Sequence, residues 1–235
     1  MRAVYKKETG SFYRSMIGYL YTAFVLAVTG VFFTVFNLRA GMTQFGYALG
    51  NTTVLLLIGI PILTMRSFAG EFRQGTAQLL FTEPVKPGAV VMGKFLAILT
   101  QFCLPLVPLA LCPVILSAYG KVSFLESYAC FLAYILMGMA CISIGVFVSS
   151  LTEHMILAAA GTFALLLASY LMNALKSLVR ADLRQLAAGL FEALSLFQRY
   201  YDFTDGMFML RHVIYYLGVT AMFLYFTKKS VERAR

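Results

Sequence analysis

The stretch SYACFLAYILMGMACISIGVFVSSL, Ser127–Leu151, decides the fold, because its 25 residues include no Asp, Glu, Lys or Arg. A helix needs about 20 mostly apolar residues to cross the hydrocarbon core of a bilayer. A second run of this kind, Met155–Leu175, follows after only the turn Thr152–His154. The two runs predict a pair of membrane-spanning helices joined by a tight turn.

The composition of the whole chain agrees with this prediction. Of 235 residues, 60% are hydrophobic and only 12% are charged, and the mean hydropathy is +0.81. Soluble domains carry roughly 25% charged residues, so a soluble protein could not cover this much apolar surface. The net charge of +9 comes from basic residues at the edges of apolar runs, which indicates membrane topology and lipid headgroups rather than nucleic acid.

Six apolar runs can be drawn along the chain, and each is close to the length of one span. We therefore predict an all-α, polytopic membrane protein with a single domain over 1–235. The predicted spans are Met16–Phe36, Tyr47–Met65, Phe95–Ser117, Ser127–Leu151, Met155–Leu175 and Phe208–Thr227.

The orientation follows from the basic residues, which favour cytoplasmic segments. If the N-terminus is cytoplasmic, the inner segments hold 12 of the 19 basic residues and each short outer loop holds one. An even number of spans then places both termini in the cytoplasm. The inner residues are Arg2, Lys6, Lys7, Arg14, Arg66, Arg73, Lys86, Lys94, Lys228, Lys229, Arg233 and Arg235.

Two further helices are predicted outside the spans. Residues 1–15 have apolar residues on one face and Arg2, Lys6 and Lys7 on the other, which favours a helix in the cytoplasmic interface. Residues 182–198 carry apolar residues, Phe197 among them, at helical spacing, which favours an amphipathic helix on the outer side. For both helices, simple surface anchoring and a specific role stay open.

One stretch resembles a nucleotide-binding motif. Gly88 to Lys94 has the spacing G-x-x-x-x-G-K of a P-loop. Phe95 stands where the motif needs Ser or Thr for magnesium, and the stretch leads directly into a predicted span. We therefore predict no nucleotide site and no enzyme activity in this chain, and we interpret Lys94 as an anchor that reaches the lipid headgroups.

Other site chemistry is equally sparse. The cysteines lie in apolar runs without metal-ligand spacing, so we expect neither a metal site nor a bound cofactor. Between their flanks the spans lack charged residues, which coupled transporters usually keep at membrane depth. The chain therefore acts passively or takes energy from a partner. Polar residues within the spans either line a pathway or bond between helices: Thr29, Asn51, Thr64, Thr162, Ser169 and Asn173.

The richest hydrophilic stretch of the predicted inner side is residues 66–94. Glu71–Phe81 can form a short helix with Phe72, Leu79 and Leu80 as apolar contacts, and two prolines end it before the third span. Physical reasoning leaves two interpretations, a connector between two spans and a docking helix for a cytoplasmic partner.

A resemblance separates these interpretations. The chain resembles membrane subunits of type-2 ATP-binding-cassette exporters, and its C-terminal part is similar to the branch with gliding-motility and nitrous-oxide-reductase-maturation permeases. The residues that carry the resemblance are Met65-Arg66, Phe68-Ala69, Glu71, Arg73, Gly75-Thr76, Leu79-Leu80, Thr82, Pro84-Val85 and Gly93-Lys94-Phe95-Leu96, with Tyr5-Lys6-Lys7-Glu8, Ser11-Phe12, Ile17-Gly18-Tyr19, Tyr201-Asp202-Phe203, Gly206, Tyr215-Tyr216-Leu217 and Leu224-Tyr225.

In that family the inner loop is a coupling helix that docks on a separate ATPase. The resemblance carries this role onto Glu71, Arg73, Gly75, Thr76, Leu79 and Leu80, whereas Gln78 and Glu83 depart from the family pattern. It implies a bacterial inner-membrane exporter with two permease subunits, identical or paralogous, and with ATP and magnesium bound by the ATPase. Membrane lipid and an extra-cytoplasmic accessory subunit are further partners that fit such an exporter.

Two other functions remain open at this point. A non-transporting assembly, sensor or mechanical subunit would use the same coupling helix. A self-sufficient secondary transporter is the third alternative, and the lack of charges within the spans argues against it.

Overall fold

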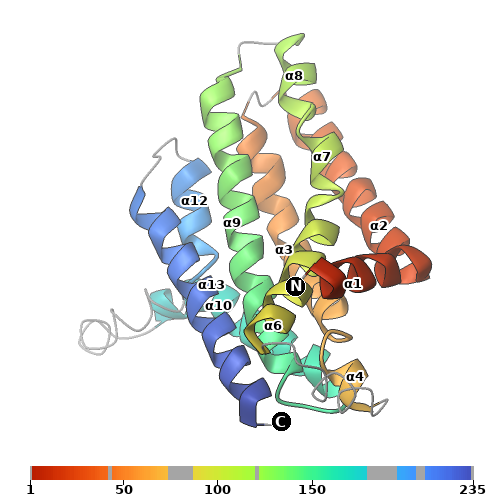
Figure 1. Ribbon diagram of the computed structural model, residues 1–235. Helices are drawn as coiled ribbons and strands as arrows, with labels where there is room; N and C mark the ends of the chain where they lie inside the picture. The colour runs from red at the N-terminus through yellow and green to blue at the C-terminus, as the bar shows by residue number, and fades with distance from the viewer. Residues whose placement is uncertain are drawn as a thin grey trace.

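The computed structural model describes residues 2–41, 44–73, 87–119, 122–178, 195–204 and 210–233, and every regular element in these ranges is a helix. The long helices run side by side, whereas α1 lies across their direction (Figure 1). The elements are α1 (Arg2–Arg14), α2 (Met16–Phe32), the π-helix η1 (Phe33–Arg39), α3 (Phe45–Thr64), α4 (Ala69–Arg73), α6 (Pro87–Cys103), α7 (Leu106–Leu109), α8 (Cys112–Ser117), α9 (Phe124–Ser149), α10 (Met155–Leu178), α12 (Gln198–Thr204) and α13 (Leu210–Arg233).

Helix α9 is the centre of the bundle. It packs against α3, α6, α10, α12 and α13. Seven consecutive residues, 140–146, are buried, so the second half of α9 is enclosed on all sides, as expected for a helix that is apolar all round. In the most apolar 18-residue window of α9, 72% of the window is buried inside the protein. The corresponding share is 22% for the span that begins with α2 and 22% for α10. The helices α2 and α10 therefore keep most of their apolar surface uncovered.

Two glycines let neighbouring helices approach α9 closely. A Cβ atom on Gly138 would lie 2.3 Å from the ring of Phe102 in α6, and one on Gly145 would lie 2.4 Å from the hydroxyl of Thr64 in α3. Small residues at such crossings allow tight van der Waals packing between membrane helices. The apolar run that decides the fold thus also fixes where α3 and α6 contact it.

The described helices include four that are long and apolar enough to cross a membrane, or five if one bent pair counts as a span. The four are Met16–Arg39, Ala48–Arg73, Phe124–Ser149 and Met155–Met172. Helix α13 contains the predicted sixth run from Leu210 onward and is long enough, but Arg211, His212 and its tyrosines leave it less apolar than the others. Six spans therefore stay a prediction.

The bent pair corresponds to the predicted third span. Helix α6 begins at Pro87, earlier than the predicted Phe95, and the chain bends by 44° between Pro87–Cys103 and Leu106–Ser117. Pro105 lies at the break, where its ring and its missing N–H prevent a continuous helix. The predicted span Phe95–Ser117 is therefore broken by a bend in the structure, and it counts as one span if the two parts cross the membrane together.

The segment before α13 also differs from the prediction. Of the predicted helix 182–198, residues 182–194 lie outside the described ranges, and residues 195–197 are not helical. Phe197 was expected on the apolar face of a surface helix, but it is buried with its ring 5.5 Å from that of Tyr170. The backbone of Leu196 is held by Ser169, which accepts its N–H at 3.1 Å, and by Tyr216, which donates to its carbonyl at 2.8 Å.

Helix α12, which follows this segment, contains the buried residue Tyr200. Tyr200 is enclosed against α9 and α3, and its hydroxyl donates to the carbonyl of Gly46 at 3.4 Å. Loss of solvent contact raises the pKa of the Tyr200 hydroxyl well above its ordinary value. This tyrosine therefore stays a neutral hydrogen-bond donor.

Polar residues within the spans mostly bond inside their own helix. Thr64 donates to the carbonyl of Ile60 at 2.9 Å, and Thr162 donates to that of Ala158 at 2.8 Å. Such bonds satisfy a hydroxyl without a partner from another helix. Of the residues predicted to bond between helices, Ser169 bonds to the non-helical backbone at Leu196, whereas Thr64 and Thr162 bond within their own helices.

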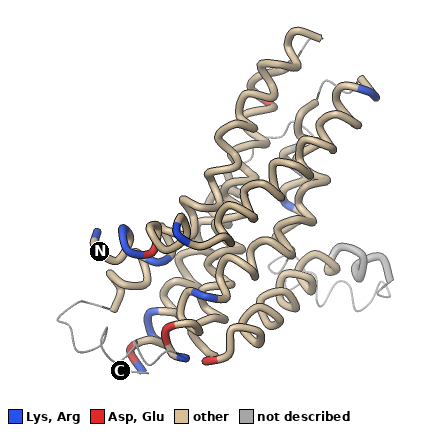
Figure 2. Tube along the Cα trace, turned by 90° about the vertical axis from the view of Figure 1, so that its right-hand side faces the viewer, with Lys and Arg blue, Asp and Glu red and all other residues tan. Residues whose placement is uncertain are grey.

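The charged residues gather at one end of the bundle. Helix α1, helix α4, the start of α6 and the end of α13 lie there, and most of the described Lys, Arg, Asp and Glu residues are at this end (Figure 2). Gly88 at the start of α6 adjoins Lys228 near the end of α13, since a Cβ atom on Gly88 would lie 3.6 Å from the Lys228 side chain. The two ends of the described chain are therefore on the same side of the bundle.

Candidate functional site

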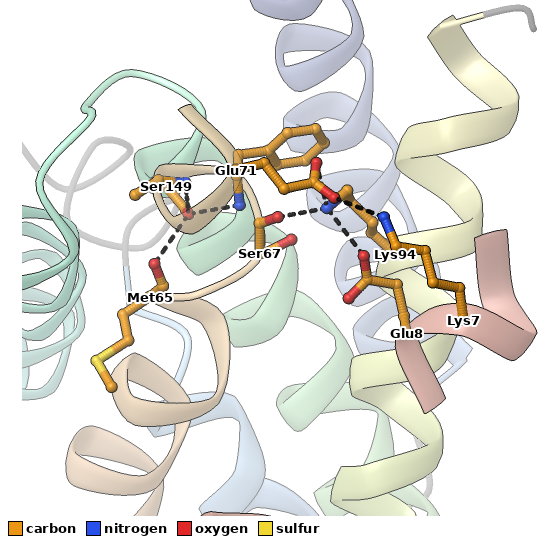
Figure 3. A network of polar contacts seen from close by, with 9 residues as sticks. Lys7, Glu8, Met65, Ser67, Glu71, Lys94 and Ser149 are labelled. Carbon is orange, nitrogen blue, oxygen red and sulfur yellow. Dashed lines mark hydrogen bonds and ion pairs between the residues drawn. The ribbon is translucent and has the colours of Figure 1, made fainter. Parts of the chain in front are cut away.

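Three helices meet at a buried lysine at the charged end of the molecule. Lys94 lies in α6, and only 1% of its surface is exposed. The helices α1 and α4 close over it from two sides (Figure 3). Burial of a lysine is costly unless the ammonium group is paired and fully hydrogen-bonded. The surroundings of Lys94 meet this condition.

The Lys94 ammonium group has three oxygen partners, one for each of its N–H bonds. Its Nζ lies 3.1 Å from Glu8 Oε1 in α1 and 2.8 Å from Glu71 Oε2 in α4, and it donates to the backbone carbonyl of Ser67. The ring of Phe68 lies below it, with its centroid 4.8 Å from Nζ. We call Glu8, Glu71, Ser67 and Lys94 the charged junction.

Lys7 is the outer member of this cluster. Its Nζ lies 3.6 Å from Glu71 Oε1, and 65% of its side chain is exposed. Exposed ion pairs contribute about 0–1 kcal/mol, so Lys7 adds little to the stability of the junction. The buried ammonium of Lys94, rather than Lys7, is the charge that joins α1, α4 and α6.

The connection between α3 and α4 is held from the other side by α9. Ser149, at the end of α9, accepts the backbone N–H groups of Phe68 and Ala69 at 3.1 Å each, and its hydroxyl lies 3.5 Å from the carbonyl of Met65 (Figure 3). The first N–H groups of a helix have no partner within it, so Ser149 supplies the missing acceptor for α4. The start of α4 is thus fixed to α9 and α6 at once.

Helix α1 is attached to α6 by more than the junction. The hydroxyls of Tyr5 in α1 and Thr100 in α6 lie 3.0 Å apart. Gln101 of α6 also donates to the carbonyl of Gly18, in the first turn of α2, at 2.9 Å. Gly18 allows this corner, because a Cβ atom there would lie 2.6 Å from the carbonyl oxygen of Phe12. Helix α1 lies within the predicted range 1–15 and has protein contacts along α6.

Lys94 is not a headgroup anchor, so that interpretation was wrong. Its side chain turns into the protein because Glu8 and Glu71 supply two carboxylates there. The stretch from Gly88 to Lys94 is continuous α-helix within α6, so the open loop that holds phosphates in a P-loop is absent at this place.

The residues predicted for ATPase coupling fall into two groups. Glu71 and Arg73 lie in α4; Glu71 belongs to the charged junction, and Arg73 is exposed. Gly75, Thr76, Leu79 and Leu80 lie outside the described residues. Glu8, Ser67 and Ser149 were not predicted as site residues. Two sequence signals pointed to Glu8: it is an acidic residue in an otherwise basic segment, and it belongs to the stretch Tyr5-Lys6-Lys7-Glu8 that carries part of the resemblance.

The site carries no sign of metal chemistry. Within the described ranges, no group of three His, Cys, Asp or Glu residues is placed to hold a metal ion. The chemistry available at the charged junction is a set of ion pairs and hydrogen bonds that join three helices.

A bundle of apolar helices with a charged, three-helix junction at one end defines a multi-pass membrane protein. The family described as ABC-2 family transporter protein matches residues 33–227, which is most of the chain, and the chain belongs to this family. It is therefore the membrane component of an ABC transporter, a class in which a separate ATPase supplies the energy. Lys94 and Glu71 lie inside the matched residues, and Glu8 lies before them. No curated protein matches the chain in sequence.

Proposed function

We propose that this chain is the membrane-spanning subunit of a bacterial ABC exporter, located in the inner membrane. Two such subunits, identical or paralogous, form the pathway, and ATP and magnesium act in a cytoplasmic ATPase. The observation that carries the proposal is the charged junction, which attaches α4 to both α1 and α6. Helix α4 contains the first residues of the segment that we expect to dock on the ATPase.

The junction gives this coupling a physical route. Movement of α4 by the ATPase would displace Glu71 and the carbonyl of Ser67, which both bind Lys94. Leaving that buried ammonium without a partner is costly, so α6 moves together with α4. Because Glu8 of α1 binds the same ammonium group, α1 moves together with α6. Displacement of the docking segment therefore reaches two further helices without any charge at membrane depth.

The uncovered apolar faces support a partner in the membrane. Helices α2 and α10 each have only 22% of their most apolar window buried. A second permease subunit or lipid would cover them. An accessory subunit outside the cytoplasm is a further partner in this proposal.

The proposed topology has six spans, with α13 as the sixth, and both termini in the cytoplasm. We expect reporter fusions after Arg235 and within residues 40–44 to report opposite sides of the membrane, because the inner segments hold the excess of basic residues. Activity of enzymatic reporters on each side provides the measurement. A C-terminal fusion on the same side as the 40–44 fusion would contradict the span count.

Reconstitution tests the function itself. We expect the purified chain alone to hydrolyse no ATP, and the chain with its ATPase to hydrolyse ATP in vesicles and to move substrate. An ATPase found in a neighbouring gene would be the first partner to use. Hydrolysis without transport of any candidate cargo favours the alternative assembly, sensor or mechanical role. Flux driven by an ion gradient, without the ATPase, would show a secondary transporter instead.

A further inference from the structure

A pocket of about 310 Å³ lies beside the charged junction. It is formed by α1, the connection between α3 and α4, helix α6 and the first residue of α10. One part of its wall is polar and contains Lys7, Arg66 and Ser67. Another part is apolar and contains Phe12, Ile98 and Met155. The proposed function does not use this pocket.

The pocket has an excess of positive charge. Glu8 and Glu71 also line it, but both carboxylates bind the ammonium of Lys94, at 3.1 Å and 2.8 Å. Arg66 is exposed and pairs with no carboxylate in the described part of the chain, and Lys7 makes only the long contact to Glu71. Lys94 does not line the pocket, but it binds both carboxylates. The three cations Lys7, Arg66 and Lys94 therefore stand against the two carboxylates, an excess of one positive charge.

Ser67 supplies a second indication of a ligand. The residue is only 5% exposed, and its hydroxyl has no hydrogen-bond partner among the described residues. A buried hydroxyl without a partner loses its hydration and gains nothing in return. An oxygen-rich anion in the pocket would satisfy this hydroxyl together with the Arg66 guanidinium, which binds phosphate oxygens in pairs.

We propose that the pocket binds the phosphate group of an anionic phospholipid. The phosphate lies near Arg66, Lys7 and Ser67, and the first carbons of the acyl chains lie against Phe12 and Met155. An acidic side chain of a protein partner would match the cations but leave the apolar wall uncovered, so a lipid fits the whole lining better. The proposal needs α1 to lie at the membrane surface, and it does not depend on coupling to an ATPase.

Lipid binding to the purified full-length chain tests this proposal. The chain in detergent is titrated with phosphatidylglycerol, with phosphatidylcholine and with inorganic phosphate, and bound species are counted by native mass spectrometry. We expect tighter binding of phosphatidylglycerol than of phosphatidylcholine. Arg66→Ala should weaken phosphatidylglycerol binding about fivefold, the effect of about one basic residue near an anionic lipid.

Two further variants make the test specific. Ser67→Ala should weaken lipid binding while the melting temperature in lipid-free detergent stays unchanged or rises, because the hydroxyl it removes has no partner in the described chain. Arg73→Ala is the matched control: it removes an exposed arginine of α4 that does not line the pocket, so lipid binding should not change.

Several results would overturn the proposal. Equal binding of both lipids, or no effect of Arg66→Ala, would show that the pocket does not select an anionic headgroup. Competition by inorganic phosphate at concentrations similar to the lipid would indicate a site for a free anion. Loss of ATPase co-purification in Arg66→Ala with unchanged lipid binding would assign the pocket to the protein partner.

Discussion

Replacing Lys94 with methionine should lower the stability of the purified chain by about 3–5 kcal/mol, the usual effect of removing one partner from a buried ion pair. Glu8 and Glu71 would stay behind with side chains only 18% and 15% exposed and without their shared cation. At about 2–4 °C per kcal/mol, the melting temperature in detergent should fall by about 6–20 °C. Thermal unfolding followed by fluorescence provides the measurement.

A compensated variant separates charge from packing. Combining Lys94→Met with Glu8→Gln and Glu71→Gln also removes the two carboxylate charges that lost their partner. We expect this triple variant to recover most of the lost stability. Lys228→Met is the control, because Lys228 pairs with Glu232 across a surface where both side chains are 47% exposed. If Lys94→Met melts at the same temperature as the unchanged chain, the charged junction does not hold α1, α4 and α6 together.

The second large effect concerns the segment after α4. Leu79→Ala together with Leu80→Ala should weaken association with the ATPase by about a hundredfold. Burial of a leucine side chain contributes ~1.5–3 kcal/mol as an upper bound, and ~2.8 kcal/mol corresponds to a factor of 100 in affinity. Co-purification from detergent-solubilised membranes measures the association, and the amount of chain in the membrane confirms insertion.

A charge variant in the same region provides the comparison. Arg73→Ala removes an exposed side chain of α4, and exposed charges contribute only about 0–1 kcal/mol to association. We therefore expect normal co-purification for this variant. If the double leucine variant also assembles normally and supports full ATP-driven activity, the segment is only a connector between two spans, and the exporter proposal loses its main physical support.

The helices could be predicted from the sequence, but the contacts between them only in part. Long apolar runs such as Ser127–Leu151 must form helices in a membrane, because every backbone group there needs a partner within the chain. The bend at Pro105 could also have been predicted from the sequence, because proline lacks the N–H that a helix interior needs. The burial of Phe197 was not readable, because its periodicity fits a surface helix equally well.

The charged junction illustrates the same limit at the site. Lys94 and Glu8 are 86 positions apart, and nothing in the local pattern of either residue indicates the other. A lysine at the edge of an apolar run has two ways to satisfy its charge, lipid headgroups or buried carboxylates. Only the packing of α1 against α6 decides between them, so the sequence led to the wrong one. The acidic residue in α4, Glu71, was recognised for another reason, its resemblance to a coupling helix.

One ammonium group that binds carboxylates from both α1 and α4 has a thermodynamic consequence. If a ligand bound to α1 favours one arrangement of the junction, it changes the affinity of α4 for its partner by a definite factor. Reciprocity then requires that partner to change the affinity of α1 for the ligand by the same factor. A molecule that binds α1 and favours one arrangement of the junction would then be an effector of α4, and a partner bound at α4 would be an effector of α1, with Lys94 as the residue that both helices share.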